Sequence, residues 1–293
     1  MIKTLLILCA VCLLLFLILI AEGRRELKFF KVTRYKLNVP RFRALDSAKK
    51  VILLADLHNK VYGTKNEELL DAVRREKPDM ILVPGDMLVG KDKVYYKEAM
   101  EFMAQLPSIA PVYYSLGNHE QRMKEDPQKY GDSIFREYRD KLKESGVIFL
   151  ENEMAECMMD RLPVRVLGIE LPMSTYEKFK RHDVSARDIE DCIGRSEADK
   201  YQILLAHNPA FFPAYKNWGA DLTVSGHLHG GIIRIPGLGG IITPQFVLFP
   251  KYSGELTVEG EQAIAVSRGL GTHTVNLRFC NYAEVVVIEL IPS

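Results

Sequence analysis

The sequence has few features that would assign it to a specialised class of protein. Two of its five cysteines lie in an apolar run. The other three show no CxxC spacing and leave an odd thiol, so neither a zinc finger nor a disulfide framework is expected. There is no internal repeat, no low-complexity stretch and, beyond the N-terminal segment, no linker rich in serine, glycine and proline. We therefore expect a single domain there, with ample material for a core.

Excess charge is also nearly absent, since the net charge is +1 over 293 residues, but the charge is unevenly distributed. Residues 24–50 contain ten lysine or arginine side chains and two acidic ones. The rest of the chain, from residue 51 onward, is therefore net acidic. An acidic body argues against a general nucleic-acid-binding surface, so nucleic acid is not expected as a partner.

A run of 18 residues without charge, residues 4–21, lies near the start of the chain. As a helix rising about 1.5 Å per residue it would span roughly 27 Å, close to the hydrocarbon thickness of a bilayer. A cleaved signal peptide is the alternative. Its apolar region is usually about 7–15 residues long and precedes a small-x-small cleavage site, which Leu19-Ile20-Ala21 does not offer. We expect residues 1–23 to be an uncleaved transmembrane helix, a single-pass anchor in the cell membrane.

Residues 24–49 are expected to be a basic juxtamembrane linker, in which the partly alternating residues 29–39 form an edge strand that Pro40 ends. The basic side chains suit anionic lipid headgroups, and a solvated linker is the alternative. The sequence does not decide which side of the membrane carries the body. The basic stretch places the body in the cytoplasm by the positive-inside rule, whereas a very short N-terminal tail commonly stays inside itself.

Short apolar runs alternate with helical patterns in residues 50–293, which we expect to form one folded domain. The runs predict buried strands at residues 51–55, 80–83, 112–116, 202–206 and 222–225. The spacing of apolar residues predicts helices at 66–76, 93–106 and 132–145. This alternation is typical of an α/β layered fold.

The second half of the chain is less regular. Residues 170–200 are polar and charged, and we interpret them as an insertion or cap with a helix near 186–193. Strand-like segments return at 231–235, 263–267 and 284–290. A second sheet built from the two ends of the domain is expected.

A polar cluster follows each of the five buried strands. The clusters hold Asp56 and His58, Asp86, Asn118 and His119, His207, and His227 with His229. In open α/β sheets ligands bind at the carboxyl ends of the strands, so these side chains are expected to converge. Carboxylates and imidazoles are ordinary metal ligands, and the Asn118 amide offers a further oxygen.

The number of candidate ligands favours two metal ions over one. A two-metal site needs a shared carboxylate, and Asp86 is the isolated acid. If the first strand continued through Asp56 and His58, their alternating spacing would point both side chains the same way. Taken singly, each cluster has an ordinary structural explanation, such as a turn at Asp86 or a hydrogen-bonded core histidine at His207. Their order, each at a strand end, favours the metal site.

The whole set resembles the calcineurin-like metallophosphoesterase superfamily, and in particular its membrane-associated bacterial YkuE/YaeI-type branch. The resemblance covers roughly residues 50–290. It rests on Asp56-Leu57-His58, Gly85-Asp86, Gly117-Asn118-His119-Glu120, His207 and Gly226-His227-Leu228-His229. It implies an α/β (α+β) fold, a four-layer sandwich of two mixed β-sheets flanked by helices.

The resemblance also implies roles for these residues. The first metal would be held by Asp56, His58 and His229, and the second by Asn118, His207 and His227. Asp86 would bridge the two ions. His119 would not bind metal but would contact the phosphate and help the leaving group depart. Glu120 would either orient a neighbouring side chain or serve as a solvated or capping residue.

Substrate contacts are less defined. Arg268 and Tyr252 are expected to touch the phosphate, and His273 is a candidate for the pocket wall, whereas His182 is interpreted as a surface histidine. The branch often has Thr and Gln where this chain has Leu228 and Ile232, which leaves substrate recognition open. Core packing is the preferred interpretation for Phe211, Phe212 and Trp218, with an apolar rim for a lipid substrate as the alternative.

These features predict a metal-dependent phosphodiesterase or phosphatase that acts on a small or lipid-linked phosphoester at the membrane. Two divalent ions, Mn, Fe or Zn, would activate a water molecule, and the sequence does not choose among the metals. A nuclease is an alternative that the acidic body and the lack of a basic groove with interleaved aromatic residues disfavour. A non-catalytic, metal-dependent scaffold of the same fold is another.

Overall fold

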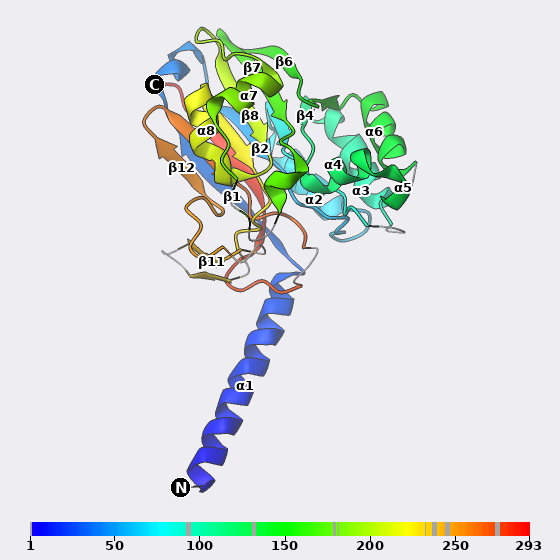
Figure 1. The fold of residues 1–293 in the computed structure, drawn as a ribbon, viewed down its shortest axis with the longest axis vertical. Coiled ribbons are helices and arrows are strands. Elements are labelled where there is room, and N and C mark those ends of the chain that lie inside the picture. The colour runs from blue at the N-terminus through cyan, green and yellow to red at the C-terminus, as the bar shows by residue number, and fades with distance from the viewer. Residues whose placement is uncertain are drawn as a thin grey trace.

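The computed structural model describes residues 2–91, 95–130, 133–177, 180, 182–231, 233–235, 239–243, 247–272 and 276–293, apart from the side chains of residues 15 and 233. In the described residues two six-stranded sheets pack face to face, with helices on both outer faces. A long helix, α1 (Ile2–Glu26), projects from one end of this sandwich (Figure 1).

The first sheet combines both ends of the domain with strands from its first half. Its strands, in spatial order, are β1 (Phe30–Leu37), β14 (Ala283–Leu290), β2 (Lys49–Leu53), β3 (Met80–Val83), β4 (Val112–Tyr114) and β5 (Ile148–Phe149). Strands β2 to β5 are parallel to one another, β14 runs antiparallel to β2, and β1 pairs in parallel with β14. The sheet is therefore mixed.

The second sheet comes from the later part of the chain. Its strands, in spatial order, are β12 (Leu256–Glu259), β13 (Gln262–Val266), β9 (Leu222–Ser225), β8 (Tyr201–Ala206), β7 (Leu162–Ile169) and β6 (Met154–Met159). The four central strands are parallel and the two edge strands are antiparallel to their neighbours. A small ribbon of β10 (Ile233–Ile235) and β11 (Gly239–Ile242) lies outside both sheets.

Alternation along the strands builds the layers. In β14, Val286 and Ile288 point into the core between the sheets, whereas Val285 and Val287 face the helices on the outer side. In β8, Ile203 faces the core between the sheets, and its neighbour faces outward. Because successive side chains of a strand point to opposite faces, strands that are apolar throughout must be covered on both sides. The continuous apolar runs in the sequence have this cause.

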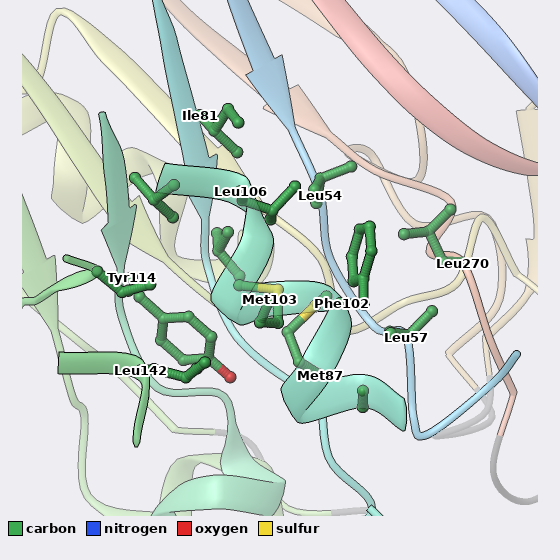
Figure 2. Close-up of a cluster of buried hydrophobic side chains, with 14 of the residues drawn as sticks. Leu54, Leu57, Ile81, Met87, Phe102, Met103, Leu106, Tyr114, Leu142 and Leu270 are labelled. Carbon is green, nitrogen blue, oxygen red and sulfur yellow. The ribbon is translucent and has the colours of Figure 1, made fainter. Parts of the chain in front are cut away.

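Helices cover the outer face of each sheet. Their bounds are α2 (Glu67–Glu76), α3 (Lys97–Gln105), α4 (Asn118–Glu125), α5 (Pro127–Tyr130), α6 (Ile134–Glu144), α7 (Ala186–Ile193) and α8 (Phe212–Trp218). Short 3-10 helices occur at Pro40–Ala44, Leu106–Ser108, Met173–Tyr176 and Pro209–Phe211. Figure 2 shows Phe102 and Met103 of α3 beside Leu54 and Ile81, in the core between the first sheet and its covering helices. The predicted sandwich of two mixed sheets flanked by helices is confirmed.

The predicted elements are present with small shifts at their ends. Helix α2 begins at Glu67 and ends at Glu76, followed by Lys77 in a left-handed conformation and by Pro78, which cannot continue the helix. The helices expected at 93–106 and 132–145 correspond to α3 and α6. Residues 93, 94 and 132 of those expectations lie outside the described residues, as does residue 232 of the expected strand 231–235.

The prediction for the second sheet was wrong. The two ends of the domain, β1 and β14, join the first sheet beside β2, and the second sheet is built from residues 154–266. The apolar pattern of a strand shows that it is buried but not which strand lies next to it. Strands β6 and β7 also escaped prediction, although β7 is buried over most of its length.

Residues 170–200 form part of the outer helical layer. Helix α7 packs against β7 and α8, and Ile189 is buried in the cluster that covers the second sheet. Its N-terminus is capped by Ser185, whose hydroxyl accepts a hydrogen bond from the Asp188 backbone N–H. The polar composition of this segment therefore reflects one exposed helix face.

The segment between the apolar run and residue 50 is integrated into the domain. Strand β1 pairs with β14 over its full length, and Leu37, Val39 and Phe42 are buried in the core between the sheets. Helix α1 continues to Glu26, so three residues separate it from β1. The residues expected as a juxtamembrane linker thus contribute the edge strand and part of the core.

Candidate metal centre

The five polar clusters come together between the two sheets. Three follow β2, β3 and β4 of the first sheet, and two follow β8 and β9 of the second. Strands β2, β3 and β4 are parallel to one another, and so are β8 and β9. Each cluster lies at or just beyond the carboxyl end of its strand. Facing edges of two sheets, rather than one edge of a single sheet, therefore form the site.

Left-handed backbone conformations aim the side chains. Asp56, His58, Asp86, His227 and His229 have φ angles of 53°, 48°, 57°, 72° and 51°. Residues other than glycine rarely adopt positive φ, and such conformations persist only where the surrounding structure enforces them. Strand β2 ends at Leu53, so left-handed turns, and not the pleat of a continuing strand, bring Asp56 and His58 together.

Gly85 shows how closely the strand ends approach. It has φ +102°, and a Cβ atom built on it would lie 1.9 Å from the Gly117 backbone nitrogen. A Cβ on Gly117 would in turn lie 2.2 Å from the Asp86 Oδ1 atom. Only glycine fits at these two positions, because any side chain would push β3 and β4 apart at the site.

Imidazoles and carboxylates form two adjoining buried groups, and Asp86 belongs to one of them. In each group one ligand atom per residue lies within 4.8 Å of the others. One group contains Asp56, His58 and His229, and the other contains Asp86, His207 and His227. The His58 Nε2 atom lies 3.8 Å from both Asp56 Oδ1 and Asp86 Oδ2, so the groups adjoin.

Backbone carbonyls fix the proton positions of two histidines. The Nδ1 atom of His207 lies 2.9 Å from the Pro84 oxygen, and that of His229 lies 3.1 Å from the Gly271 oxygen. A carbonyl oxygen can only accept, so each Nδ1 carries a hydrogen and each Nε2 presents its lone pair when the ring is neutral. This arrangement is typical of metal-binding histidines.

His119 has the opposite arrangement. Its Nδ1 atom accepts a hydrogen bond of 2.8 Å from the Gly90 backbone N–H. The proton of the neutral ring must then reside on Nε2, which lies 4.0 Å from Asp86 Oδ2. His119 also forms a group of suitable spacing with His58 and Asp86. Its protonated Nε2 favours a donor over a metal ligand.

Glu120 holds Asp86 in place. Its buried carboxylate accepts hydrogen bonds from the backbone N–H groups of Asp86, Leu88 and Gly117 and from the Tyr114 hydroxyl. Burial and the nearby Asp86 charge raise the pKa of Glu120 to about 7. The residue is not solvated. It caps α4 and orients the loop that carries Asp86.

The carboxylates respond to the imidazoles around them. Burial raises the pKa of Asp56 to about 7 against the opposing charge of His207. Burial also acts on Asp86, but the charges of His207 and His119 outweigh it and hold its pKa well below the usual range. Burial lowers the pKa of His207, but the charge and hydrogen bond of Asp86 outweigh this effect and raise the pKa to about 9. Positive charge is therefore favoured between these carboxylates, as a bound cation would provide it.

The donor set fits divalent metal ions. The buried Asn118 Oδ1 atom has no hydrogen-bond partner among the described residues, although a buried amide oxygen normally has one. Together with carboxylate oxygens and imidazole nitrogens, it suits Mn, Fe or Zn. The described ligand groups contain no thiolate.

The two predicted substrate contacts are occupied elsewhere. The Arg268 Nε atom donates to the Gly254 carbonyl and lies 3.7 Å from Glu284. The Tyr252 hydroxyl donates to Glu259, and its ring packs on Phe212 in the core between the second sheet and its covering helices. The structure does not bring Tyr252 into the histidine groups. Arg268 is closer, because Gly269, the next residue, adjoins both Asp56 and His229.

A pocket of about 530 Å³ lies beside the centre. Its wall includes Tyr176, His182, Asn208, His227 and Leu228. The Tyr176 ring lies 5.0 Å from that of His227, a contact that the charged sequence around it gave no means of predicting. His182 is half-buried rather than solvated, and its Nε2 atom has no hydrogen-bond partner in the described part of the chain.

Some of the predicted positions fall outside the pocket or outside the described residues. His273 and Ile232 lie outside the described residues. Phe212 and Trp218 are core residues, whereas Phe211 is half-buried and lines the pocket. Sequence reasoning also missed Arg278, which is fully buried and donates to the carbonyls of Gly269 and Gly271.

Comparison with known proteins assigns the family. Residues 49–231 match the calcineurin-like phosphoesterase family. The chain belongs to this family. Because the family hydrolyses phosphoesters with metal ions and the buried groups can hold them, the chain is a metal-dependent phosphoester hydrolase.

Relatives of the chain come from the expected branch. Phosphodiesterase YaeI of Escherichia coli (strain K12) is 27% identical over 267 residues, which cover 90% of this chain and 89% of YaeI. The uncharacterized metallophosphoesterase YkoQ of Bacillus subtilis (strain 168) is 26% identical and covers 97% of this chain and 99% of its own length. YkuE from the same organism is 24% identical, over 82% and 78% of the two chains.

Among solved structures, the Thermus thermophilus sulfate thiohydrolase SoxB has the same fold. It superposes with a TM-score of 0.50 at 12% sequence identity, covering 83% of this chain and 56% of SoxB. At this identity the likeness concerns the fold alone.

Proposed function

We propose that the protein is a membrane-anchored phosphodiesterase or phosphatase whose site holds two divalent metal ions. One ion would be bound by Asp56, His58 and His229, and the other by Asn118, His207 and His227. Asp86 would bridge them. The observation that carries the proposal is that two buried ligand groups adjoin at Asp86, with proton positions that leave His207 and His229 as ligands.

When bound, the ions supply an activated water and neutralise charge on the phosphoryl oxygens. The chain itself supplies a hydrogen-bond donor for the leaving oxygen and the orientation of Asp86. His119 would donate a hydrogen bond from its Nε2–H group to the leaving oxygen, because Gly90 holds its Nδ1 as an acceptor. Glu120 and the His119 backbone N–H fix Asp86 through its loop and its Oδ1 atom. Preorganised groups of this kind need no rearrangement during the reaction.

Helix α1 supports the membrane anchor. It is the one helix in the described residues that is long and apolar enough to cross a membrane. Its apolar side chains are largely exposed. A signal sequence near the N-terminus would have the same properties. A reporter fused after residue 293 would establish which side of the membrane carries the domain, and the mass of the mature protein would reveal cleavage.

The class of substrate follows from the site and the anchor together. The relative YaeI is named a phosphodiesterase, which favours a diester. An anchored enzyme meets lipid-linked phosphoesters at high local concentration, so these are the preferred substrates over small soluble ones. The net acidic body disfavours the alternative of a nuclease. The complete set of candidate ligands, with His119 also present, disfavours a non-catalytic scaffold.

Metal content and turnover together test the proposal. The full chain in detergent is loaded with Mn, Fe or Zn, and hydrolysis of bis(p-nitrophenyl) phosphate is measured beside the metal bound per chain. Two ions per chain and turnover are expected. The Asp86→Asn variant should lose most of both, whereas the surface variant Asp79→Asn should retain both. Full metal binding and hydrolysis by Asp86→Asn would contradict the assignment.

A further inference from the structure

We propose that an apolar rim beside the pocket rests on the bilayer that holds α1 and takes in phosphoesters of membrane lipids. The rim consists of Phe29, Ile235, Val247, Leu248 and Phe249. This inference deepens the proposed function and rests on its placement of α1 in a membrane. It adds a docking surface and a path by which the substrate reaches the metal centre.

The first observation is that α1 is fixed to the domain. The Asn281 backbone N–H donates to the buried Glu26 carboxylate at 2.9 Å, and the Arg278 N–H donates to the Gly23 carbonyl at 3.3 Å. A Cβ atom on Gly23 would lie 2.6 Å from Leu277, so helix and loop are in close contact. The domain is therefore not free to tumble on a flexible tether.

The second observation is where this junction lies relative to the bilayer. The uncharged run ends at Ala21, and Arg24, Arg25 and Lys28 follow within seven residues. Basic and aromatic side chains that flank an apolar helix lie at the headgroup level. Gly23 and Glu26, and with them the docked loop, would then lie at the membrane surface. Phe29, which is 52% exposed and follows Glu26 by three residues, would lie at the same level.

The third observation is a set of exposed apolar side chains at this end of the molecule. Figure 1 shows β11 at the end of the sandwich from which α1 projects. The chain that follows it exposes Leu248 and Phe249 by 62% and 65%. Backbone hydrogen bonds from Thr243 to Val247 and from Phe249 to Ile241 hold this chain against β11. Such patches on an otherwise soluble surface mark contacts with membranes or proteins.

The backbone of Phe249 adds to this argument. Phe249 has φ 47°, a left-handed conformation that is uncommon for a bulky residue. The side chain is nevertheless exposed, so no packing in the domain core offsets the unfavourable backbone conformation. A large aromatic group presented in this way suits insertion into the interfacial layer of a bilayer, where apolar area is buried.

The rim continues into the pocket. Val247 lines the pocket that contains His227, and Leu228 and Phe211 add apolar surface to the same wall. A lipid chain passing over Val247 would leave its phosphoester beside His227 and Tyr176. A bilayer, rather than a protein, is the favoured occupant because α1 already brings this end of the domain to the membrane surface.

Tryptophan fluorescence tests the docking without any need for turnover. The chain has one tryptophan, Trp218, which is 6% exposed in the outer core. The full-length variant Phe249→Trp is reconstituted into nanodiscs with and without brominated phosphatidylcholine. A matched variant, Met158→Trp, alters a side chain on β6 that is 61% exposed. We expect bromolipid to quench the added fluorescence of Phe249→Trp and to leave that of Met158→Trp unchanged.

Two outcomes would overturn the docking surface. Equal quenching for both variants would show that the rim lies no closer to the lipid than β6, and no quenching for either would show that the rim does not reach the lipid. A blue-shifted but unquenched emission from Phe249→Trp would show that a protein, such as a second copy of the chain, covers the rim instead.

Hydrolysis tests the path to the site. The double variant Leu248→Glu/Phe249→Glu is compared with Val258→Glu, which alters a 49% exposed residue on β12. Each is given a p-nitrophenyl phosphodiester of diacylglycerol in vesicles, and bis(p-nitrophenyl) phosphate in solution. We expect the double variant to lose hydrolysis of the lipid diester and keep that of the soluble one, with Val258→Glu unaffected. Unchanged hydrolysis of the lipid diester by the double variant would contradict the path.

The two proposals fail in different ways. If the unmodified protein hydrolyses neither diester, the proposed reaction is wrong, while the quenching experiment still reports on docking. If it hydrolyses the soluble diester and the rim variants behave like their controls, the reaction stands and the docking surface does not.

Discussion

The Glu26 carboxylate in the last turn of α1 accepts a hydrogen bond from the backbone N–H of Asn281, 255 residues later in the chain. The Asn281 side chain in turn donates to the carbonyl oxygens of His229 and Gly231, at 2.7 and 2.6 Å. The end of the apolar helix is thus two hydrogen bonds away from a candidate metal ligand. This connection couples the end of α1 to the backbone that carries His229.

Removing the Glu26 carboxylate should weaken this connection. The Glu26→Ala change leaves the Asn281 N–H buried without its partner, which costs roughly 1–3 kcal/mol of unfolding free energy. Glu22→Ala is the matched control, because Glu22 lies one turn earlier and pairs with exposed Arg25. Thermal unfolding of the two variants in nanodiscs measures the difference. A loss no greater for Glu26→Ala than for Glu22→Ala would contradict the connection.

Asn281 should influence the affinity for metal. Outer partners that orient a metal-binding histidine typically change affinity by about 10–100-fold. We expect Asn281→Ala to lower metal affinity within this range, because the backbone of His229 loses its support. Asn276→Ala is the control, since Asn276 bonds only to Thr272 among the described contacts and is exposed. Titration of the apo-protein with metal gives both affinities, and equal values for the two variants would exclude the effect.

His119 should affect catalysis and not metal content. We expect His119→Ala to lower kcat by about 10²–10³-fold, because the leaving oxygen loses its hydrogen-bond donor. The loss should be largest for diesters with a poor leaving group, such as an alkyl alcohol, and smallest for p-nitrophenolate, which leaves without a proton. Metal per chain should stay unchanged. A uniform loss across leaving groups, or a loss of metal, would assign His119 a different role.

Gly85 should tolerate no side chain. In Gly85→Ala the new Cβ would lie 1.9 Å from the Gly117 nitrogen at φ +102°, so β3 and β4 must separate. We expect a loss of at least about 3 kcal/mol in unfolding free energy and loss of activity. Gly260→Ala is the control, since Gly260 has φ +69° but open space around it, and should cost about 1 kcal/mol. Denaturant unfolding compares them, and similar losses would argue against the close approach.

The Arg34–Glu76 pair should stabilise the domain in a pH-dependent way. Burial raises the pKa of Glu76, but the hydrogen bond and charge of Arg34 outweigh this effect and lower the pKa below its usual 4.5. A lowered carboxyl pKa contributes stability above the usual value and loses it as the pH falls through the lowered one. Arg34 is half exposed, so Arg34→Gln should cost roughly 1 kcal/mol at pH 7 and nothing in strong acid.

The control for this pair is Arg187→Gln. Arg187 is 88% exposed and lies 4.0 Å from Asp191 in a weak surface pair, so its loss should be near zero at every pH. Unfolding free energies measured from pH 3 to pH 7 compare the two variants. An Arg34→Gln effect that does not diminish as the pH falls would contradict the assigned cause.

The sequence by itself determined most of the elements and the types of ligand side chain at the site. Apolar runs mark buried strands because both faces of each sheet are covered, as Val285 and Val286 of β14 illustrate. The polar residues after those runs, from Asp56 to His229, carry the metal-ligand types and the family resemblance. Both signals are local, so they can be recognised in the sequence without knowledge of the fold.

Only the tertiary structure decided how these parts meet. Apolar periodicity says nothing of which strands are neighbours. The assignment of each strand to one of the two sheets, and the place of β1 and β14, therefore could not be foreseen. The left-handed turns at Asp56 and His58, and the carbonyl that sets the proton of His207, depend on backbone from distant segments. The contact of Glu26 with Asn281 is of the same kind, because its two partners come from opposite ends of the chain.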